Sequence, residues 1–168
     1  MHIVKFAFLF SLLIVAFSCK DDEPTVVSKS QLIARSWQIQ ALTITLGTTP
    51  IPGYTRGGAQ NIINLDAFRL NFKPDGSYVQ TNEDGSVDSN YSWKFINSET
   101  AFALITQPSQ YTVQWTLDEL TDRTLNFSRK IAANSTDPSD LYYLNLLKAA
   151  GLPTAAGATL SIKATAAS

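Results

Sequence analysis

The chain has 168 residues, of which 45% are hydrophobic, and its 13 basic and 14 acidic side chains give a formal charge of −1. That length suits one domain with a single core. A nearly neutral chain lacks the basic face that nucleic-acid binding requires, so we expect no nucleic-acid partner.

The first 18 residues have the pattern of a secretory signal. Lys5 precedes an apolar run over 6–17, and the small residue Ser18 stands directly before Cys19,. The run is shorter than the roughly 20 apolar residues that span a membrane. Cleavage before Cys19 would remove the single histidine, His2, and leave a formal charge of −2.

The segment Val15-Ala16-Phe17-Ser18-Cys19 resembles the lipobox of bacterial lipoproteins. The resemblance implies that the thiol of Cys19 receives a diacylglycerol and that the new amine carries a further acyl chain such as palmitate. Several acyl chains hold a protein on a bilayer far better than one chain does, which makes the membrane a partner. The alternative is a soluble secreted protein with an ordinary cut near Cys19.

The segment Lys20-Asp21-Asp22-Glu23 is similar to the export tag of surface-exposed lipoproteins in some Gram-negative bacteria. The resemblance implies a lipid-anchored outer-membrane protein that faces outward, whereas the alternative is a solvated acidic tether. We therefore divide the chain into a signal peptide (1–18), an acidic tether (19–29) and one folded domain (30–168).

The sequence of the folded domain predicts an all-β fold. Ser28 or Ser30 can cap a short helical turn that ends near Arg35,. Beyond it, apolar residues alternate with polar ones, which is typical of antiparallel strands with one buried face. Turn residues such as Pro74-Asp75-Gly76 and Glu83-Asp84-Gly85 separate the runs,. The expected strands are 37–46, 67–73, 77–82, 90–96, 101–106, 110–117, 123–130 and 158–165.

The eight expected strands, joined mostly by hairpins, predict an up-and-down meander. Three segments depart from its regular alternation. The apolar set of the first strand changes phase between Ile39 and Leu42, which predicts a bulge,. The segment 47–61 lacks periodicity and is expected to be a long loop. Asp137 and Pro138 begin a helix with an apolar stripe that ends at Gly151,. We expect this helix to pack on the outside of the sheet.

Several short motifs resemble the lipocalin-like domain of small Gram-negative bacterial lipoproteins. They cover roughly residues 30–130 and are Leu32 to Trp37, Leu70-Asn71-Phe72-Lys73-Pro74-Asp75-Gly76-Ser77-Tyr78, Tyr91-Ser92-Trp93, and Leu120-Thr121-Asp122-Arg123-Thr124-Leu125-Asn126-Phe127. The resemblance implies an eight-stranded barrel with one helix before the last strand, and small-molecule binding.

In lipocalins a glycine stands two residues before the first-strand tryptophan, and a late arginine stacks on that indole. Here Arg35 holds the glycine position, and Arg123 or Arg129 is expected to stack on Trp37,.

Candidate ligand-binding residues are aromatic or lie in the expected loop. Tyr54 and Arg56 would form a mouth, because an aromatic ring with a guanidinium suits sugars or anionic head groups. The alternative is that Tyr54 and Arg56 lie in an exposed loop whose polar side chains have no role in binding. Tyr91, Trp93 and Trp115 would line the interior, with the alternative that they fill the core, because an eight-stranded barrel has little spare volume.

We expect neither a catalytic site nor a metal site. The mature domain would contain neither an imidazole nor a free thiol. Histidine-dependent catalysis would therefore lack its base, and common zinc sites would lack their usual ligands. No carboxylate pair suggests a hydrolase. The alternation from Asn82 to Asp88 faintly resembles a calcium loop but lacks its final bidentate acid, which favours a hairpin turn.

Two hypotheses about function remain. The first is a monomeric, non-catalytic protein that needs no cofactor and binds a small apolar or amphipathic molecule. The second is a structural or accessory surface lipoprotein that contacts a glycan or another envelope protein. An apolar cavity of about 300 Å³ or more that opens near Tyr54 would favour the first, and a filled interior the second.

Substitution Cys19→Ala is expected to release the protein from membranes, because it removes the atom that carries the lipid. Fractionation of cells that express the wild-type or variant chain measures this. A variant that stays in the membrane fraction would contradict lipid anchoring at Cys19.

Overall fold

The computed structural model describes residues 27–167, so the predicted signal peptide, Cys19 and residues 20–26 of the tether lie outside the described part. Its helices are α1 (Lys29–Ile33) and α2 (Pro138–Ala149). Its strands are β1 (Ser36–Leu46), β2 (Thr49–Thr55), β3 (Arg69–Phe72), β4 (Ser77–Thr81), β5 (Val87–Ile96), β6 (Ala101–Thr106), β7 (Thr112–Leu120), β8 (Thr124–Ile131) and β9 (Ala158–Ala166). No helix in residues 27–167 is long and apolar enough to cross a membrane.

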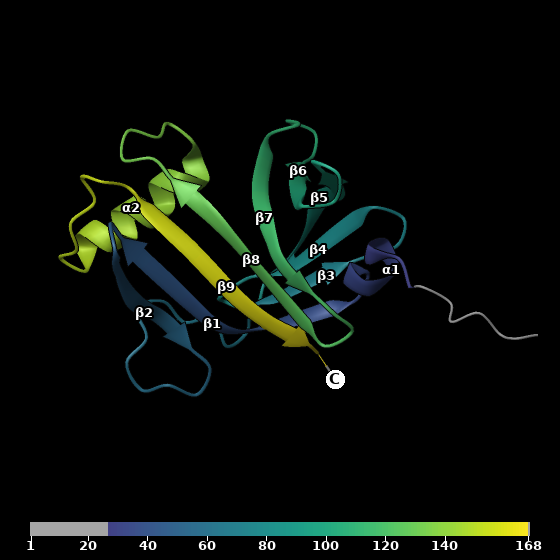
Figure 1. Cartoon of the computed structure of the whole chain (residues 1–168), viewed down its shortest axis with the longest axis horizontal. Helices are drawn as coiled ribbons and strands as arrows, with labels where there is room; N and C mark the ends of the chain where they lie inside the picture. Colours follow the sequence, from purple (N-terminus) through teal and green to yellow (C-terminus); the bar gives the residue numbers. More distant parts are fainter. Residues whose placement is uncertain (1–26, 168) are drawn as a thin grey trace, which may run out of the picture.

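The strands form a closed antiparallel barrel, as the alternation predicted. Strands β3 to β9 pair with their neighbours in chain order, and β1 closes the ring by pairing with both β3 and β9. These eight strands match the predicted ones, with end points that differ by at most three residues. The expected fold class, an all-β up-and-down barrel of eight strands with one helix before the last strand, is confirmed (Figure 1).

The predicted bulge in the first strand is also confirmed. The register of β1 against β9 shifts between Ile39 and Ala41, which leaves Gln40 as the extra residue. Residues on both sides of the shift still point inward, since Ile39 and Leu42 are both 2% exposed. The bulge therefore keeps the apolar face of a long, bent strand on the core.

The prediction of an aperiodic loop over 47–61 is wrong, because β2 lies inside that range. Gly47, at φ +59°, makes a tight turn that folds β2 back onto β1. Strand β2 pairs only with β1 and forms an edge of the sheet, where Pro50 and Pro52 are tolerated because an edge strand has an unpaired side,. These prolines and Gly53 hid the strand from pattern recognition.

One end of the barrel, which we call the α1 end, carries the β3–β4, β5–β6 and β7–β8 turns. Helix α1 is joined to it by Lys29, whose Nζ donates to the carbonyl of Glu99 at 2.8 Å, and by Arg35, which donates to the carbonyl of Asp122. Ser28 caps α1 with a capping box that includes Gln31, as predicted for a serine at this place,.

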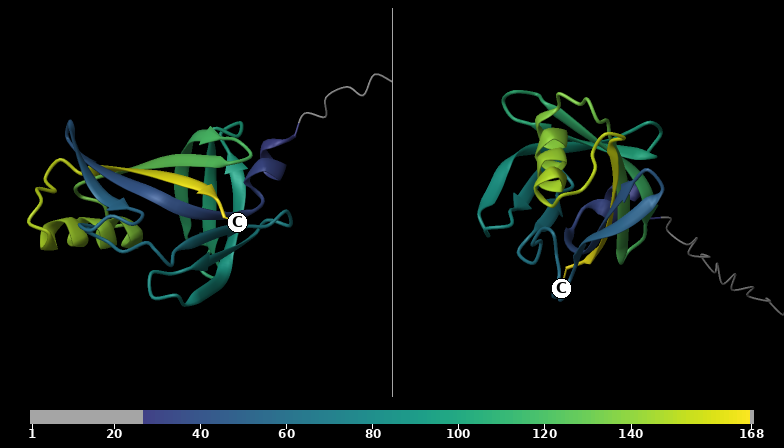
Figure 2. Two further views of the ribbon diagram at one scale, coloured as in Figure 1. Left: turned by 90° about the horizontal axis from the view of Figure 1, so that it is seen from below. Right: turned by 90° about the vertical axis from the view of Figure 1, so that its left-hand side faces the viewer.

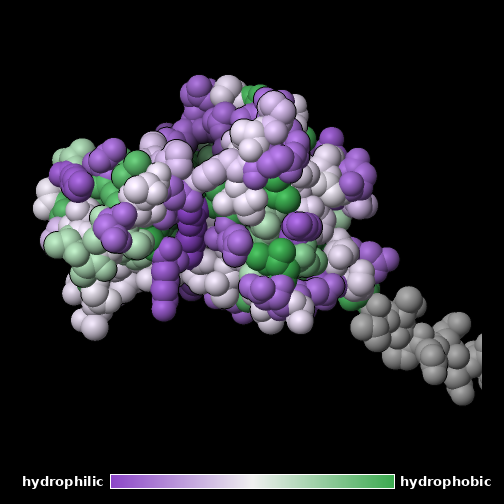
Figure 3. Space-filling model, turned by 90° about the horizontal axis from the view of Figure 1, so that it is seen from above, coloured by the Kyte–Doolittle hydropathy of each residue, from purple (hydrophilic) through white to green (hydrophobic). Residues whose placement is uncertain are grey.

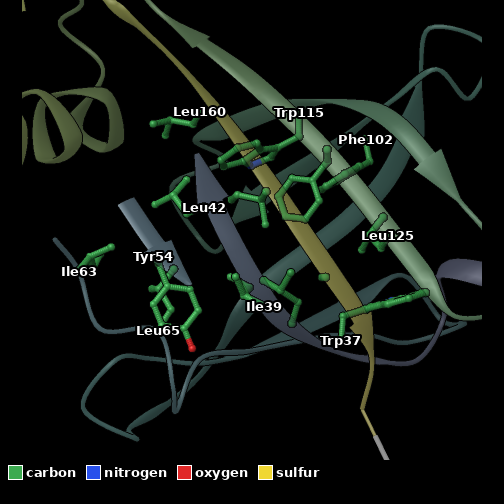
Figure 4. Packing of buried hydrophobic residues seen from close by; sticks show 14 of the residues in the cluster. Trp37, Ile39, Leu42, Tyr54, Ile63, Leu65, Phe102, Trp115, Leu125 and Leu160 are labelled. Atoms are coloured by element: carbon green, nitrogen blue, oxygen red, sulfur yellow. The ribbon is translucent and has the colours of Figure 1, made fainter. Parts of the chain in front are cut away.

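Aromatic side chains fill the α1 end. Trp37 is fully buried and its Nε1 donates to the carbonyl of Ile33 at 2.9 Å, while Trp93 Nε1 donates to the carbonyl of Lys73 at 2.9 Å. Phe72 packs edge-on against Trp93 with ring centroids 5.5 Å apart. Figure 4 shows Trp37 at this end of the cluster, well away from Trp115.

The expected cation on Trp37 is supplied by a different arginine. Arg35 lies with its Cζ 5.7 Å from the centroid of the Trp37 ring, so the residue in the glycine position itself stacks on the indole,. Arg129 instead lies 5.9 Å from the ring of Trp115, and the side chain of Arg123 is 89% exposed. The prediction that Arg123 or Arg129 stacks on Trp37 is wrong.

The opposite end, which we call the α2 end, carries the β4–β5 hairpin and α2. Asp137 caps α2 by accepting from the backbone N–H of Ser139 and Asp140, as predicted. The helix does not pack on the outer wall of the barrel. The right-hand view of Figure 2 looks at the α2 end and shows the helix lying across that end of the barrel. The expected position of this helix is therefore wrong, and its capping and extent are right.

The outer surface shown from above is mostly hydrophilic, with hydrophobic residues in scattered patches (Figure 3). Among the described residues, the large hydrophobic side chains that stay exposed are Val27, Val87, Leu141 and Tyr142.

Substitution Trp93→Ala is expected to lower the free energy of unfolding by about 3–5 kcal/mol, because the ring is 8% exposed and its loss leaves a cavity,. Urea unfolding measures the change. The control Lys94→Ala, on the exposed face of the same strand, should change it by less than about 0.5 kcal/mol,. Equal curves for wild type and Trp93→Ala would contradict a core role.

Candidate functional site

A cavity of about 550 Å³ occupies the half of the barrel toward the α2 end. This volume lies within the range of small-molecule sites. Tyr78, Phe102 and Phe127 are almost completely buried and form part of its floor. Further apolar residues of its wall are Ile39, Leu42, Leu65, Phe68, Leu70, Phe72, Leu104, Val113 and Ile162.

A layer of packed aromatic rings forms the base of the cavity, and further rings such as Tyr91 line its wall. A chain of edge-on contacts connects Phe72 to Phe102, Phe102 to Phe127 and Phe127 to Trp115, with centroids 5.0–5.5 Å apart. Above that layer the wall carries smaller side chains, such as Leu104, which pairs with Val113 on the adjacent strand. An eight-stranded barrel can hold one small ligand only where its interior is left unfilled in this way.

Helix α2 forms the roof of the cavity and is fastened to the wall by an ion-pair cluster. Arg129 on β8 lies 2.7 Å from Asp140 and 3.0 Å from Asp137, and its side chain is only 11% exposed. Ser135 Oγ donates to Asp140 at 2.6 Å. Ser139, Tyr142 and Tyr143 of α2 face the cavity. The roof is thus held by charges that have little contact with water.

The carboxylate of Asp137 is stabilised in its charged form. Burial raises its pKa, but the Tyr111 hydroxyl, the hydrogen bond from Ser139, the backbone N–H of Asp140 and the charge of Arg129 outweigh it and bring the pKa down to about 2,.

A second link crosses the mouth. Tyr142 Oη donates to Glu83 Oε1 at 3.0 Å, which connects α2 to the β4–β5 hairpin. Burial, the hydrogen bond to Glu83 and the charge of Glu83 raise the pKa of Tyr142 to about 12, so this phenol keeps its proton at physiological pH. Both side chains are exposed, so the link contributes little to stability and can open,.

The candidate residues named from the sequence fall into three places. Tyr91 and Trp115 line the cavity, together with Arg129. Trp93 lies in the filled α1 end, outside the cavity wall. Tyr54 and Arg56 do not line the cavity, and Tyr54 is 1% exposed rather than at a loop tip.

Tyr54 and Arg56 hold the segment after β2 against β1. Tyr54 Oη donates to Asp66 Oδ1 at 2.6 Å, and Arg56 Nε donates to the carbonyl of Ile39 at 2.9 Å. Figure 4 shows Tyr54 beside Leu65 and apart from Trp115. Neither residue lines the cavity, although Leu65 beside Tyr54 does.

Sequence reasoning missed the polar part of the site. Gln80 and Asn82 at the end of β4 and Tyr142 and Tyr143 on α2 all face the cavity. The alternation of Gln80 and Asn82 with outward residues was a usable signal, since it continues the inward face of Tyr78,. The contribution of α2 was hidden, because no sequence pattern places a helix across a barrel end.

The wall of the cavity is mostly apolar, with a few polar and charged side chains. In residues 27–167 no three His, Cys, Asp or Glu side chains gather closely enough to hold a metal ion. The segment from Asn82 to Asp88 forms the β4–β5 hairpin, in which Asp84 Oδ1 accepts from the backbone N–H of Ser86 at 2.9 Å.

Comparison with known proteins adds little to these findings. No family model matches the chain, and no curated protein matches it significantly. A search of solved structures finds a lipocalin-like protein from Bacteroides uniformis, with 12% identity over 78% of this chain and 96% of that chain and a TM-score of 0.40. This likeness supports no inference about ligand or activity, and the barrel is established by the strand pairings described above.

Substitution Asp137→Asn is expected to cost up to about 2 kcal/mol of unfolding free energy at pH 7, since one pKa unit corresponds to about 1.4 kcal/mol. Asn is an equally good helix cap, so the change removes mainly the charge. The pKa of Asp137 is lower in the folded state, so its stabilisation is complete above about pH 5 and is lost as pH falls toward 2,. Urea unfolding of both proteins from pH 7 to pH 2 should show their difference shrinking below about pH 5. A difference that is constant with pH would contradict the assigned role of this carboxylate.

Proposed function

We propose that this protein binds a small apolar or amphipathic molecule in the cavity beneath α2 and performs no chemistry on it. The observation that carries the proposal is the cavity of about 550 Å³ with a largely apolar wall and a few polar groups near its mouth. Burial of apolar ligand surface there would supply most of the binding free energy.

Aromatic rings in the wall support the same proposal. Trp115, Tyr91 and Phe102 face the cavity from three strands, β7, β5 and β6. Rings of this kind offer large flat apolar surfaces with few rotatable bonds, so they bind apolar ligands at low cost in conformational entropy. The proposal agrees with small-molecule binding as implied by the lipocalin-like motifs of the sequence.

We propose further that a lipid on Cys19 anchors the domain to an outer membrane with its surface exposed. The lipobox-like segment and the acidic residues after it support this proposal. The chain enters the domain at Val27, directly before α1, while the cavity opens at the α2 end. The described domain therefore begins at the end of the barrel opposite the mouth.

Binding can be tested with the fluorescent apolar probe N-phenyl-1-naphthylamine. Its emission should rise on addition of the folded domain and saturate at one probe per chain. Substitution Val113→Trp, which fills the cavity wall, should weaken probe binding at least tenfold.

The matched control is Gln114→Trp, at the neighbouring exposed position of β7, which should leave probe affinity unchanged. Melting curves of both variants establish that they fold, because overpacking costs only about 1–3 kcal/mol. A wild-type protein that does not bind the probe, or equal affinities for the two variants, would contradict the proposed function.

A further inference from the structure

One strip of the cavity wall is polar, and it runs along the inner face of β4 toward the mouth. Tyr78 is fully buried, and its hydroxyl donates to Gln80 Oε1 at 3.2 Å. Gln80 Nε2 donates in turn to Asn82 Oδ1 at 2.6 Å. All three residues line the cavity, so the strip leads from its floor to its opening.

The strip continues into the β4–β5 hairpin and ends on a carboxylate. Asn82 Nδ2 donates to Ser86 Oγ at 3.0 Å, and Ser86 Oγ donates to Asp84 Oδ1 at 2.6 Å. A carboxamide group has two N–H donors and an oxygen with two lone pairs. Gln80 and Asn82 each use one N–H in this series of hydrogen bonds, so each side chain can still form a hydrogen bond with a polar group of a ligand.

The charges around the opening are negative. Glu83 and Asp84 both line the cavity, and Glu83 also accepts the hydrogen bond from Tyr142. Among the described residues that line the cavity, Arg129 is the one cation, and it is already paired with the carboxylates of Asp137 and Asp140.

Resting on the proposed function, we infer that the cavity takes an amphipathic molecule whose polar end is a hydrogen-bond donor without negative charge, an alcohol or an ammonium group. Its apolar body lies on the aromatic floor, and its head group bonds Gln80, Asn82 or Glu83 at the mouth. A carboxylate head would meet two like charges and find no unpaired cation, because Arg129 is committed to Asp137 and Asp140,.

The inference is tested by displacement of N-phenyl-1-naphthylamine with three ten-carbon compounds that differ only in their head group: decanol, decylammonium and decanoate. The titrations are run at pH 7.5 and low ionic strength, since salt screens exposed charges. Decanol and decylammonium should each bind at least tenfold more tightly than decanoate.

Two variants locate the selectivity. In the double variant Glu83→Gln, Asp84→Asn, which keeps the hydrogen-bonding atoms and removes both charges, the preference for decylammonium over decanoate should fall below threefold. Gln80→Leu should lower the affinity for decanol at least fivefold relative to the affinity for the probe. The control Glu99→Gln removes one charge from the exposed β5–β6 turn at the α1 end and should preserve every ratio.

The outcomes separate this inference from the proposed function. Decanoate binding as tightly as the other two compounds, or probe binding that none of the three displaces, overturns the head-group inference and leaves the binding cavity intact. Selectivity that survives the double variant also overturns it. Failure of wild-type protein to bind the probe overturns both.

Discussion

The packing of Trp37 and Trp93 into the α1 end of the barrel is the interaction on which the rest of the structure depends. Each indole is buried and donates its N–H to a backbone carbonyl, of Ile33 and Lys73 respectively, so neither ring leaves an unpaired polar atom in the core,. Through these two bonds the rings hold α1 and the β3–β4 turn against the barrel. Without a disulfide in the described domain, whose sequence has no cysteine, this filled end supplies much of the stability,.

Filling one end with large rings lets the other end stay open. The edge-on series from Trp93 through Phe72 and Phe102 ends at Phe127 and Trp115, and that layer closes the barrel from below. Toward α2 the wall combines aliphatic and carboxamide side chains with the rings of Tyr91, Tyr142 and Tyr143, and a cavity of about 550 Å³ remains between them. A barrel filled evenly would be more stable, because empty volume lowers stability.

Strand alternation predicted the barrel because each of its strands has one inward apolar face, and the helix cap at Asp137 was readable because capping is local,. Strand β2 was hidden because edge strands tolerate the prolines and glycine that usually exclude a strand,. The stacking of Arg35 on Trp37 and the placing of α2 across the mouth depend on how distant segments meet. Of the five aromatic or basic residues proposed for binding, Tyr91 and Trp115 line the cavity, since alternation tells inward from outward but not which end is filled.

The division of the barrel into a filled end and an open end is tested most directly by titration with decanol, followed by ¹⁵N-correlated NMR. The indole N–H signals of the three tryptophans are observed, each assigned with a Trp→Phe variant. Trp115 lines the cavity, whereas the other two indoles are bonded to backbone in the filled end. The Trp115 signal should shift and saturate at one equivalent while those of Trp37 and Trp93 stay in place. Three unmoved signals, or shifts of Trp37 and Trp93 as large as that of Trp115, would contradict a ligand cavity above a filled end.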